Sequence, residues 1–214
     1  MTKSGEQRRI YTIGHSTHRI EHFVSLLERH GIDTVMDVRS VPYRSRQPQF
    51  DRRNLIGSLR SSGIKYVFLG RSLGWRSDNP ELYEDGRIKY RLLAETSVFK
   101  RGIRRVRKGS EHGNIVLMCA QEDPLDCHRT IFVARELAKK GEDVGHILSD
   151  GQVKTHDVMM EHLVKRLGLR RQMDLFLTER QMEKNLVDEA CSIQERRIAC
   201  SDRKPAWKAR EIST

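Results

Sequence analysis

The segment from Cys119 to Arg129 combines two thiols, an imidazole and a guanidinium within a short stretch of chain. An apolar, strand-like run ends at Cys119, and a helix is expected to begin close to Cys127. The amide dipoles of that helix start and the charge of Arg129 favour a thiolate or a bound anion there. We therefore take Cys119, Cys127 and His128 as candidate catalytic residues and Arg129 as a candidate substrate ligand. A packed, inert Cys119 is the alternative interpretation.

Zinc is the metal that has to be weighed, since Cys119, Cys127, His128 and His15 are all of ligand types that bind it. Adjacent side chains at a helix start are expected to point in different directions, which would separate the Cys127 thiol from the His128 imidazole. The sequence also contains no C-x2-C pair. We therefore predict no metal site, and the motifs leave the cofactor unknown.

A second group of candidates follows the first strand-like run, in Gly14-His15-Ser16-Thr17. Ser16 or Thr17 can cap the helix that follows, and backbone N–H groups at such a turn face an incoming anion. We predict His15 as a catalytic proton-transfer residue, as for His128, and Ser16 as a substrate ligand. A hydrogen-bonded structural histidine is the alternative at position 15.

A third group lies in the basic, proline-restrained loop after the second strand-like run. Alternation along the strand sends Asp37 and Arg39 to the same side, where they can form an ion pair. Arg39 and Arg46 offer planar, forked donors that suit phosphate, and Phe50 can serve as a stacking platform. These residues are predicted to bind substrate, and a solvated basic loop is the alternative. The later segment 70–76 is expected to form a wall or lid of the same pocket.

The elements that position these residues follow an alternating pattern. Five short apolar runs at 9–13, 34–38, 65–69, 114–119 and 143–148 predict buried strands, and the segments between them have helical spacing. This pattern predicts an α/β fold: a Rossmann-like, mostly parallel five-stranded sheet with helices on both faces. Ligands of such sheets bind outside the carboxyl ends of the strands, so we expect the candidates to converge there.

The residue pattern of the chain changes after the fifth run. Residues 156–167 have the spacing of one more amphipathic helix, which would close an α/β domain spanning residues 9–168. Residues 169–214 are charged and poor in strand signals. They are expected to form a helical extension, with a helix over 173–193 and a flexible end.

Three motifs together resemble one family. They are Thr12-Ile13-Gly14-His15-Ser16, the run Asp37-Val38-Arg39-Ser40-Val41-Pro42 followed by Arg46-Gln47-Pro48-Gln49-Phe50, and Met118-Cys119-Ala120 through Cys127-His128-Arg129. The chain resembles the uncharacterised family called domain of unknown function 488 over about residues 10–148. The resemblance implies a small α/β domain of bacteria or archaea. The matched positions are His15, Asp37, Arg39, Arg46, Pro48, Phe50, Cys119, Cys127, His128 and Arg129, whereas Leu73-Gly74-Trp75-Arg76 departs from the family's pattern.

Charge favours an anionic partner. The net charge is +11, and residues 38–108 hold 18 Lys and Arg against 6 Asp and Glu, so this region accounts for the whole imbalance. Such a local surplus predicts a basic surface for a phosphate-bearing small molecule or nucleic acid, with a solvated surface as the alternative. No run approaches the ~18 apolar residues of a membrane span. A polar start and four sparse cysteines, expected as free thiols, predict a cytoplasmic protein.

Two functions from different classes follow from these features. The first is an enzyme that holds a phosphate-bearing substrate, a nucleotide or nucleic acid, with Arg39, Arg46 and Arg129 and uses Cys119 as nucleophile. The second is a non-catalytic module whose basic face binds nucleic acid. The sequence leaves the reaction and the oligomeric state open.

Overall fold

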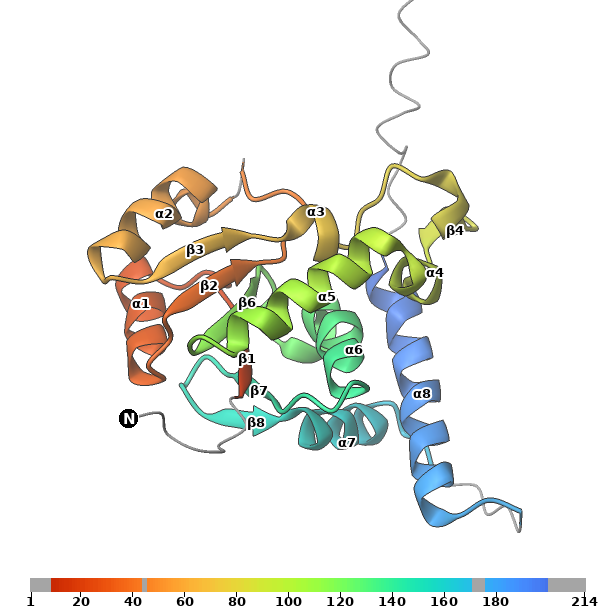
Figure 1. Cartoon of the computed structure of the whole chain (residues 1–214). Coiled ribbons are helices and arrows are strands. Elements are labelled where there is room, and N and C mark those ends of the chain that lie inside the picture. Colours follow the sequence, from red (N-terminus) through yellow and green to blue (C-terminus); the bar gives the residue numbers. More distant parts are fainter. Residues whose placement is uncertain (1–8, 44–45, 171–175, 200–214) are drawn as a thin grey trace, which may run out of the picture.

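The computed structural model describes residues 9–43, 46–170 and 176–199. Figure 1 shows a mixed α/β fold built on one central sheet, in strand order β3-β2-β6-β1-β7-β8. The predicted Rossmann-like α/β class is confirmed, but the sheet has six strands, not five. The strands of this sheet are β1 (Ile10–Gly14), β2 (Thr34–Asp37), β3 (Lys65–Phe68), β6 (Ile115–Cys119), β7 (Val144–Ile147) and β8 (Val153–Thr155).

The strand that the prediction missed is β8, which pairs antiparallel with β7 at the end of the sheet. It has three residues, Val-Lys-Thr, all half-buried, so it carries no apolar run of the kind that marks the other strands. A second, two-stranded sheet is formed by β4 (Tyr83–Glu84) and β5 (Arg87–Ile88), which were also not predicted. Strand β8 and the two strands of the second sheet are too short to be detected from hydrophobic periodicity.

Helices cover both faces of the sheet, as predicted. On one face, Phe23 and Leu27 of the first helix and Leu55 and Leu59 of the second pack on Val116 and other residues of the strands. The opposite face is covered by the helices between residues 70 and 138, whose buried side chains surround alternate residues of the same strands. The helices are α1 (Ile20–Arg29), α2 (Arg52–Ser61), α3 (Gly70–Leu73), α4 (Tyr90–Glu95), α5 (Ser97–Ser110), α6 (Arg135–Ala138), α7 (His156–Arg166) and α8 (Glu179–Ile198).

The strand order explains how distant segments come together. Strand β6 lies between β2 and β1 and is parallel to both, so its end at Cys119 lies between Gly14 and Asp37. The helices that follow β1 and β2 pack on one face, whereas α6, which follows β6, packs on the other. Adjacent strands whose helices leave to opposite faces create a crevice at their carboxyl ends.

Helix α8 lies along one side of the domain (Figure 1). Thr178 and Gln181 form a capping box at its start, and buried Ala190 and Cys191 pack it against α7. The helix extends five residues beyond the predicted end at 193, and its last residue Ile198 packs on the core. The predicted flexible end falls on residues 200–214, which lie outside the described residues. Within the described part of the chain, no helix is long and apolar enough to cross a membrane.

Candidate functional site

A pocket of about 510 Å³ opens at the carboxyl ends of the strands, next to the end of β6. Its walls come from the loops after β2, β3 and β6 and from the end of α8. The expected wall after β3 is present, because Trp75 and Arg76 border the pocket. The lining residues are Arg39, Ser40, Val41, Trp75, Arg76, Tyr90, Cys119, Ala120, Gln121, Asp126, Cys127, His128, Arg197 and Ile198.

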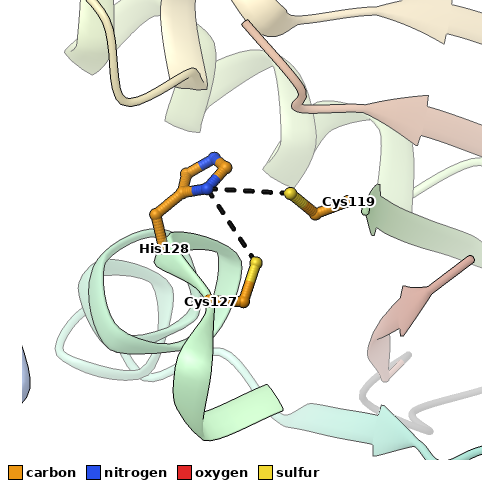
Figure 2. Close-up of side chains that lie close together, drawn as sticks. All are labelled: Cys119, Cys127 and His128. Atoms are coloured by element: carbon orange, nitrogen blue, oxygen red, sulfur yellow. Dashed lines mark hydrogen bonds between the residues drawn. The ribbon is translucent and has the colours of Figure 1, made fainter. Parts of the chain in front are cut away.

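Two thiols and one imidazole meet at this pocket, and we call Cys119, Cys127 and His128 the thiol cluster. Figure 2 shows both sulfurs facing one ring nitrogen of His128. The His128 Nδ1 lies 3.7 Å from the Cys119 Sγ and 3.9 Å from the Cys127 Sγ. All three side chains are buried, with exposed fractions of 2 to 6%. The cluster therefore offers three chemically reactive atoms within one small volume.

The expectation that Cys127 and His128 point apart is wrong, and the backbone gives the reason. A short 3-10 turn, Pro124–Asp126, delivers Cys127 in an extended conformation with φ −133° and ψ 139°. His128 is already helical, with φ −60° and ψ −26°, and begins the π-helical turn Arg129–Ala134. Because the backbone changes conformation between the two residues, both side chains can approach the end of β6.

The hydrogen bonds of His128 define which ring nitrogen carries a proton. Its Nε2 lies 3.2 Å from the carbonyl oxygen of Val38, at the end of β2. A carbonyl oxygen can only accept, so Nε2 carries the proton and donates it to Val38. In the neutral ring Nδ1 then presents its lone pair to the two sulfurs.

The two cysteines differ in the direction of their pKa shifts. The hydrogen bond between the two thiols, together with burial, raises the pKa of Cys119. Burial also acts to raise the pKa of Cys127, but the hydrogen bond from Cys119 and the positive charge of Arg129 outweigh it and lower that pKa. The Cys127 thiol is therefore the first of the pair to lose its proton.

Arg129 supports the loop instead of lining the pocket. Its side chain is fully buried, and its guanidinium donates to the carbonyl oxygens of Gln121 and Glu122, the latter at 2.9 Å. Gly14 makes room for this arrangement, because a Cβ there would lie 1.9 Å from the Gln121 carbonyl oxygen. Arg129 thus fixes the conformation of the loop between Cys119 and Cys127. Its positive charge acts to lower the pKa of both thiols.

A second buried group lies beside the thiol cluster, and we call Asp37, Arg39 and His15 the arginine cluster. The expected ion pair is present, with Arg39 NH2 2.7 Å from the Asp37 carboxylate. Arg39 NH1 donates to the Phe50 carbonyl oxygen at 2.9 Å and lies 3.1 Å from His15 Nε2. The Tyr66 hydroxyl also donates to Asp37, at 2.7 Å. Every nitrogen of the Arg39 side chain therefore has a partner.

His15 and Phe50 are not among the pocket-lining residues, and both contact Arg39. The His15 ring stacks on Phe50 with centroids 4.2 Å apart, and both side chains are buried. Burial and the neighbouring charge of Arg39 lower the pKa of His15 to about 4. A neutral imidazole that accepts from Arg39 is therefore the state of this residue near neutral pH, and it orients the guanidinium.

Two further predicted ligands lie away from the pocket lining. Ser16 donates to the exposed Glu122 at 2.9 Å, and Arg46 is exposed. Sequence reasoning in turn missed Tyr90, Arg197 and Ile198, which border the pocket. Tyr90 and the end of α8 reach it together, since the Tyr90 amide donates to Glu195 at 2.8 Å. These residues follow no predicted strand, so no sequence signal tied them to the strand ends.

These features define a doubly wound α/β protein with a thiol-lined pocket at the point where the strand order changes direction. Residues 19–135 match the family model described as "Domain of unknown function DUF488", and the chain belongs to this family. The match includes Arg39 and the thiol cluster and begins after His15. Comparison with curated proteins found no match, and comparison with solved structures found none either.

Proposed function

We propose that the protein is an enzyme that acts on a phosphate-bearing substrate, a nucleotide or nucleic acid, bound in the strand-end pocket. The observation that carries the proposal is the meeting of two sulfurs and one imidazole nitrogen, within 3.7 and 3.9 Å, beside a pocket bordered by arginines. Reactive groups that converge on a concave site are the usual mark of catalysis.

The anion-binding part of the proposal is supported by the pocket rim. The exposed guanidinium groups of Arg76 and Arg197 border the pocket, and Arg76 stacks over Trp75 at 4.6 Å. Among the described lining residues the one carboxylate belongs to Asp126, and Arg166 pairs with it at 2.8 Å. The rim therefore carries guanidinium groups, which suit a phosphate.

The residues divide into two roles. Cys119, Cys127 and His128 touch the pocket and form the reactive centre, and Arg76 and Arg197 bind the phosphate. Arg39 also borders the pocket, but its charge is already balanced by Asp37. His15 and Arg129 act through their neighbours, as positioning residues for Arg39 and for the thiol loop.

The experiment screens nucleoside mono-, di- and triphosphates and short RNA and DNA oligonucleotides, with thermal shift for binding and phosphate release or chromatography for turnover. A true ligand at 100 times its Kd adds about 2.7 kcal/mol of stability. Arg76→Ala and Arg197→Ala should each weaken binding about 10- to 100-fold, because each removes a charge-assisted hydrogen bond. Cys119→Ala should bind the ligand normally but lose turnover.

Arg46→Ala is the matched control, since it removes an exposed arginine from the same basic region but outside the pocket lining. It should leave both binding and turnover unchanged. Equal turnover by wild type and Cys119→Ala would contradict the catalytic role of the cluster. Equal losses in Arg46→Ala and Arg76→Ala would contradict the pocket as the binding site.

A non-catalytic nucleic-acid-binding module is the second candidate, and a separate observation favours it. A cleft of about 500 Å³ beside the edge strand β3 is bordered by Arg52, Arg71 and Arg105. Arg52 lies over the ring of Phe68 at 5.1 Å, in an arrangement of cations and aromatic rings that suits a single strand. Binding there should weaken steeply with salt. This candidate would be favoured if Arg76→Ala and Cys119→Ala still bind DNA or RNA and the wild-type protein shows no turnover.

A further inference from the structure

The thiol cluster has the geometry of a metal site. A tetrahedral zinc ion with bonds of about 2.3 Å to sulfur and about 2.0 Å to nitrogen places its sulfur and nitrogen ligands roughly 3.5 Å apart. The observed separations from His128 Nδ1 are 3.7 Å to Cys119 and 3.9 Å to Cys127. All three ligand atoms lie within 4.8 Å of one another. The two nitrogen-to-sulfur separations therefore exceed the zinc-bound value by only a few tenths of an ångström.

The contact of His128 with the backbone is an independent sign of the same site. Its Nε2 donates to the Val38 carbonyl oxygen at 3.2 Å, which leaves the Nδ1 lone pair directed at the sulfurs. Histidines that bind metals almost always donate their other ring N–H to a carbonyl or carboxylate in this way, because that bond fixes the tautomer and the ring orientation.

The ligands are also held in place before any ion binds. Cys119 ends the fully buried strand β6, and its carbonyl oxygen accepts from the His15 amide at 2.9 Å. The Cys127 carbonyl oxygen accepts from the Thr130 and Ile131 amides, each at 3.1 Å. A site built on such elements loses little conformational entropy when the ion enters.

The charges of the two thiolates favour binding of a divalent cation. Two buried thiolates without a counter-ion would be strongly destabilising, whereas two thiolates and one Zn²⁺ are neutral together. Sulfur ligands disfavour Mg²⁺ and Ca²⁺, which prefer oxygen.

We propose that Cys119, Cys127 and His128 bind one Zn²⁺ ion with its fourth coordination position open to the pocket. Two cysteines and one histidine with an open position is a donor set of catalytic zinc sites. The one carboxylate among the described pocket-lining residues belongs to Asp126, and it is held by Arg166 at 2.8 Å and by Gln194 at 2.7 Å. The open position is therefore left to water or to a substrate oxygen.

Only the use of this ion rests on the proposed function. In an enzyme that acts on a phosphate ester, zinc would polarise a phosphoryl oxygen or lower the pKa of a bound water. Zinc binding itself depends on the three ligands alone.

The test measures metal directly in the full chain, purified under reducing conditions without a polyhistidine tag. After incubation with zinc and removal of free ion, elemental analysis should find about one zinc per chain. Titration of the metal-free protein with Co²⁺ should produce thiolate-to-cobalt charge-transfer bands and the intense visible bands of a tetrahedral site.

Variants assign the site to its residues. Cys119→Ser, Cys127→Ser and His128→Ala should each lower zinc affinity by about a hundredfold or more, which exceeds the usual effect of losing a supporting contact. Cys191→Ser is the matched control, because this buried cysteine contacts Met160 of α7 and lies outside the cluster. It should retain full zinc content and the cobalt spectrum.

A measurement on the wild type keeps the test decisive if a variant fails to fold. Zinc should protect Cys119 and Cys127 from alkylation, as read by peptide mass spectrometry. Substoichiometric zinc without cobalt bands, or a cobalt spectrum that Cys119→Ser leaves unchanged, would overturn the proposal. A Cys119–Cys127 disulfide in protein isolated without air would overturn it too.

The outcomes separate the two proposals. Full zinc binding with no turnover of any phosphorylated compound would contradict the proposed function alone. Turnover that survives complete removal of metal by a chelator, in protein that binds no zinc, would contradict the metal site alone.

Discussion

The arginine cluster and the thiol cluster lie side by side at the same edge of the sheet, yet their polar atoms are used differently. In the arginine cluster, Arg39 donates hydrogen bonds to Asp37, the Phe50 carbonyl oxygen and His15. The Tyr66 hydroxyl donates a further hydrogen bond to the Asp37 carboxylate. In the thiol cluster, the two sulfurs lie 3.7 and 3.9 Å from the His128 Nδ1, which is too far for strong hydrogen bonds.

This difference separates a structural group from a functional one. Buried polar atoms that are fully paired fix a local structure, whereas atoms left with weak partners are available to a ligand. Both clusters contain the residue types of an active site, so type alone does not distinguish them. The number of strong partners does, so we expect the stability lost on substitution to follow that number.

The largest expected effect is in the arginine cluster. Asp37→Asn leaves the Arg39 guanidinium buried without its counter-charge, and breaking a buried ion pair in this way typically destabilises a protein by about 3–5 kcal/mol. Urea unfolding should show this loss with an unchanged m-value. Asp78→Asn, at an exposed position, is the control and should change stability by less than about 0.5 kcal/mol. A loss as small as the control's would show that Asp37 and Arg39 are not a structural pair.

The next effect concerns a third buried group, the histidines His146 and His156. His146 bonds Thr12 at 2.8 Å and His156 at 3.2 Å, so it is as fully paired as the arginine cluster. Burial lowers the pKa of His156 to about 4, and burial together with His156 lowers that of His146 well below its usual value. Both rings are therefore neutral in the folded protein near neutral pH.

Their contribution to stability is complete above pH 6.5, because the unfolded histidines are then neutral as well. This contribution is lost as the pH falls from 6.5 towards 4, because these histidines bind protons in the unfolded state but not in the folded state. Between pH 7.5 and 5, His156→Asn should lose about 2 kcal/mol less than wild type. Chemical denaturation at both pH values measures this. Equal losses in the two proteins would mean that His156 is protonated in the fold.

Sequence periodicity predicted the strands that carry the site because each is an uninterrupted buried run. Strand β6, Ile-Val-Leu-Met-Cys, is buried throughout, and its end at Cys119 was predicted to the residue. The missed strand β8 is half-buried and is selected by pairing with β7. Tertiary contacts determine such an element, so its own residues do not encode it.

The candidate residues were predicted better than their partners. Loops after strands pointed to Arg39, Cys119 and His128, and these do border one pocket. The same reasoning could not show that Arg129 turns towards Gln121 and Glu122, since that depends on the closed form of the loop. Nor could it show the approach of Cys127 to His128, which depends on a change of backbone conformation between adjacent residues.

A smaller effect should come from the edge of the arginine cluster. Tyr66→Phe removes the hydroxyl that donates to Asp37 at 2.7 Å. The ring remains, so the loss is that of one hydrogen bond to a charged group at a half-buried site, about 1–2 kcal/mol. In the Asp37→Asn background the same change should have a smaller effect, because its partner charge is gone. Additive effects in this double-mutant cycle would show that the hydroxyl and the carboxylate do not interact.

The smallest effect is expected in the thiol cluster, provided that no metal is bound. In chelator-treated protein, Cys119→Ser should reduce the unfolding free energy by about 1 kcal/mol, because the thiol makes only weak hydrogen bonds. With zinc at 100 times the wild-type Kd, wild type should gain about 2.7 kcal/mol that the variant does not. Thermal unfolding with and without zinc measures both differences. A large loss in the metal-free protein would place Cys119 among the structural residues, beside Asp37, and remove the distinction between the two clusters.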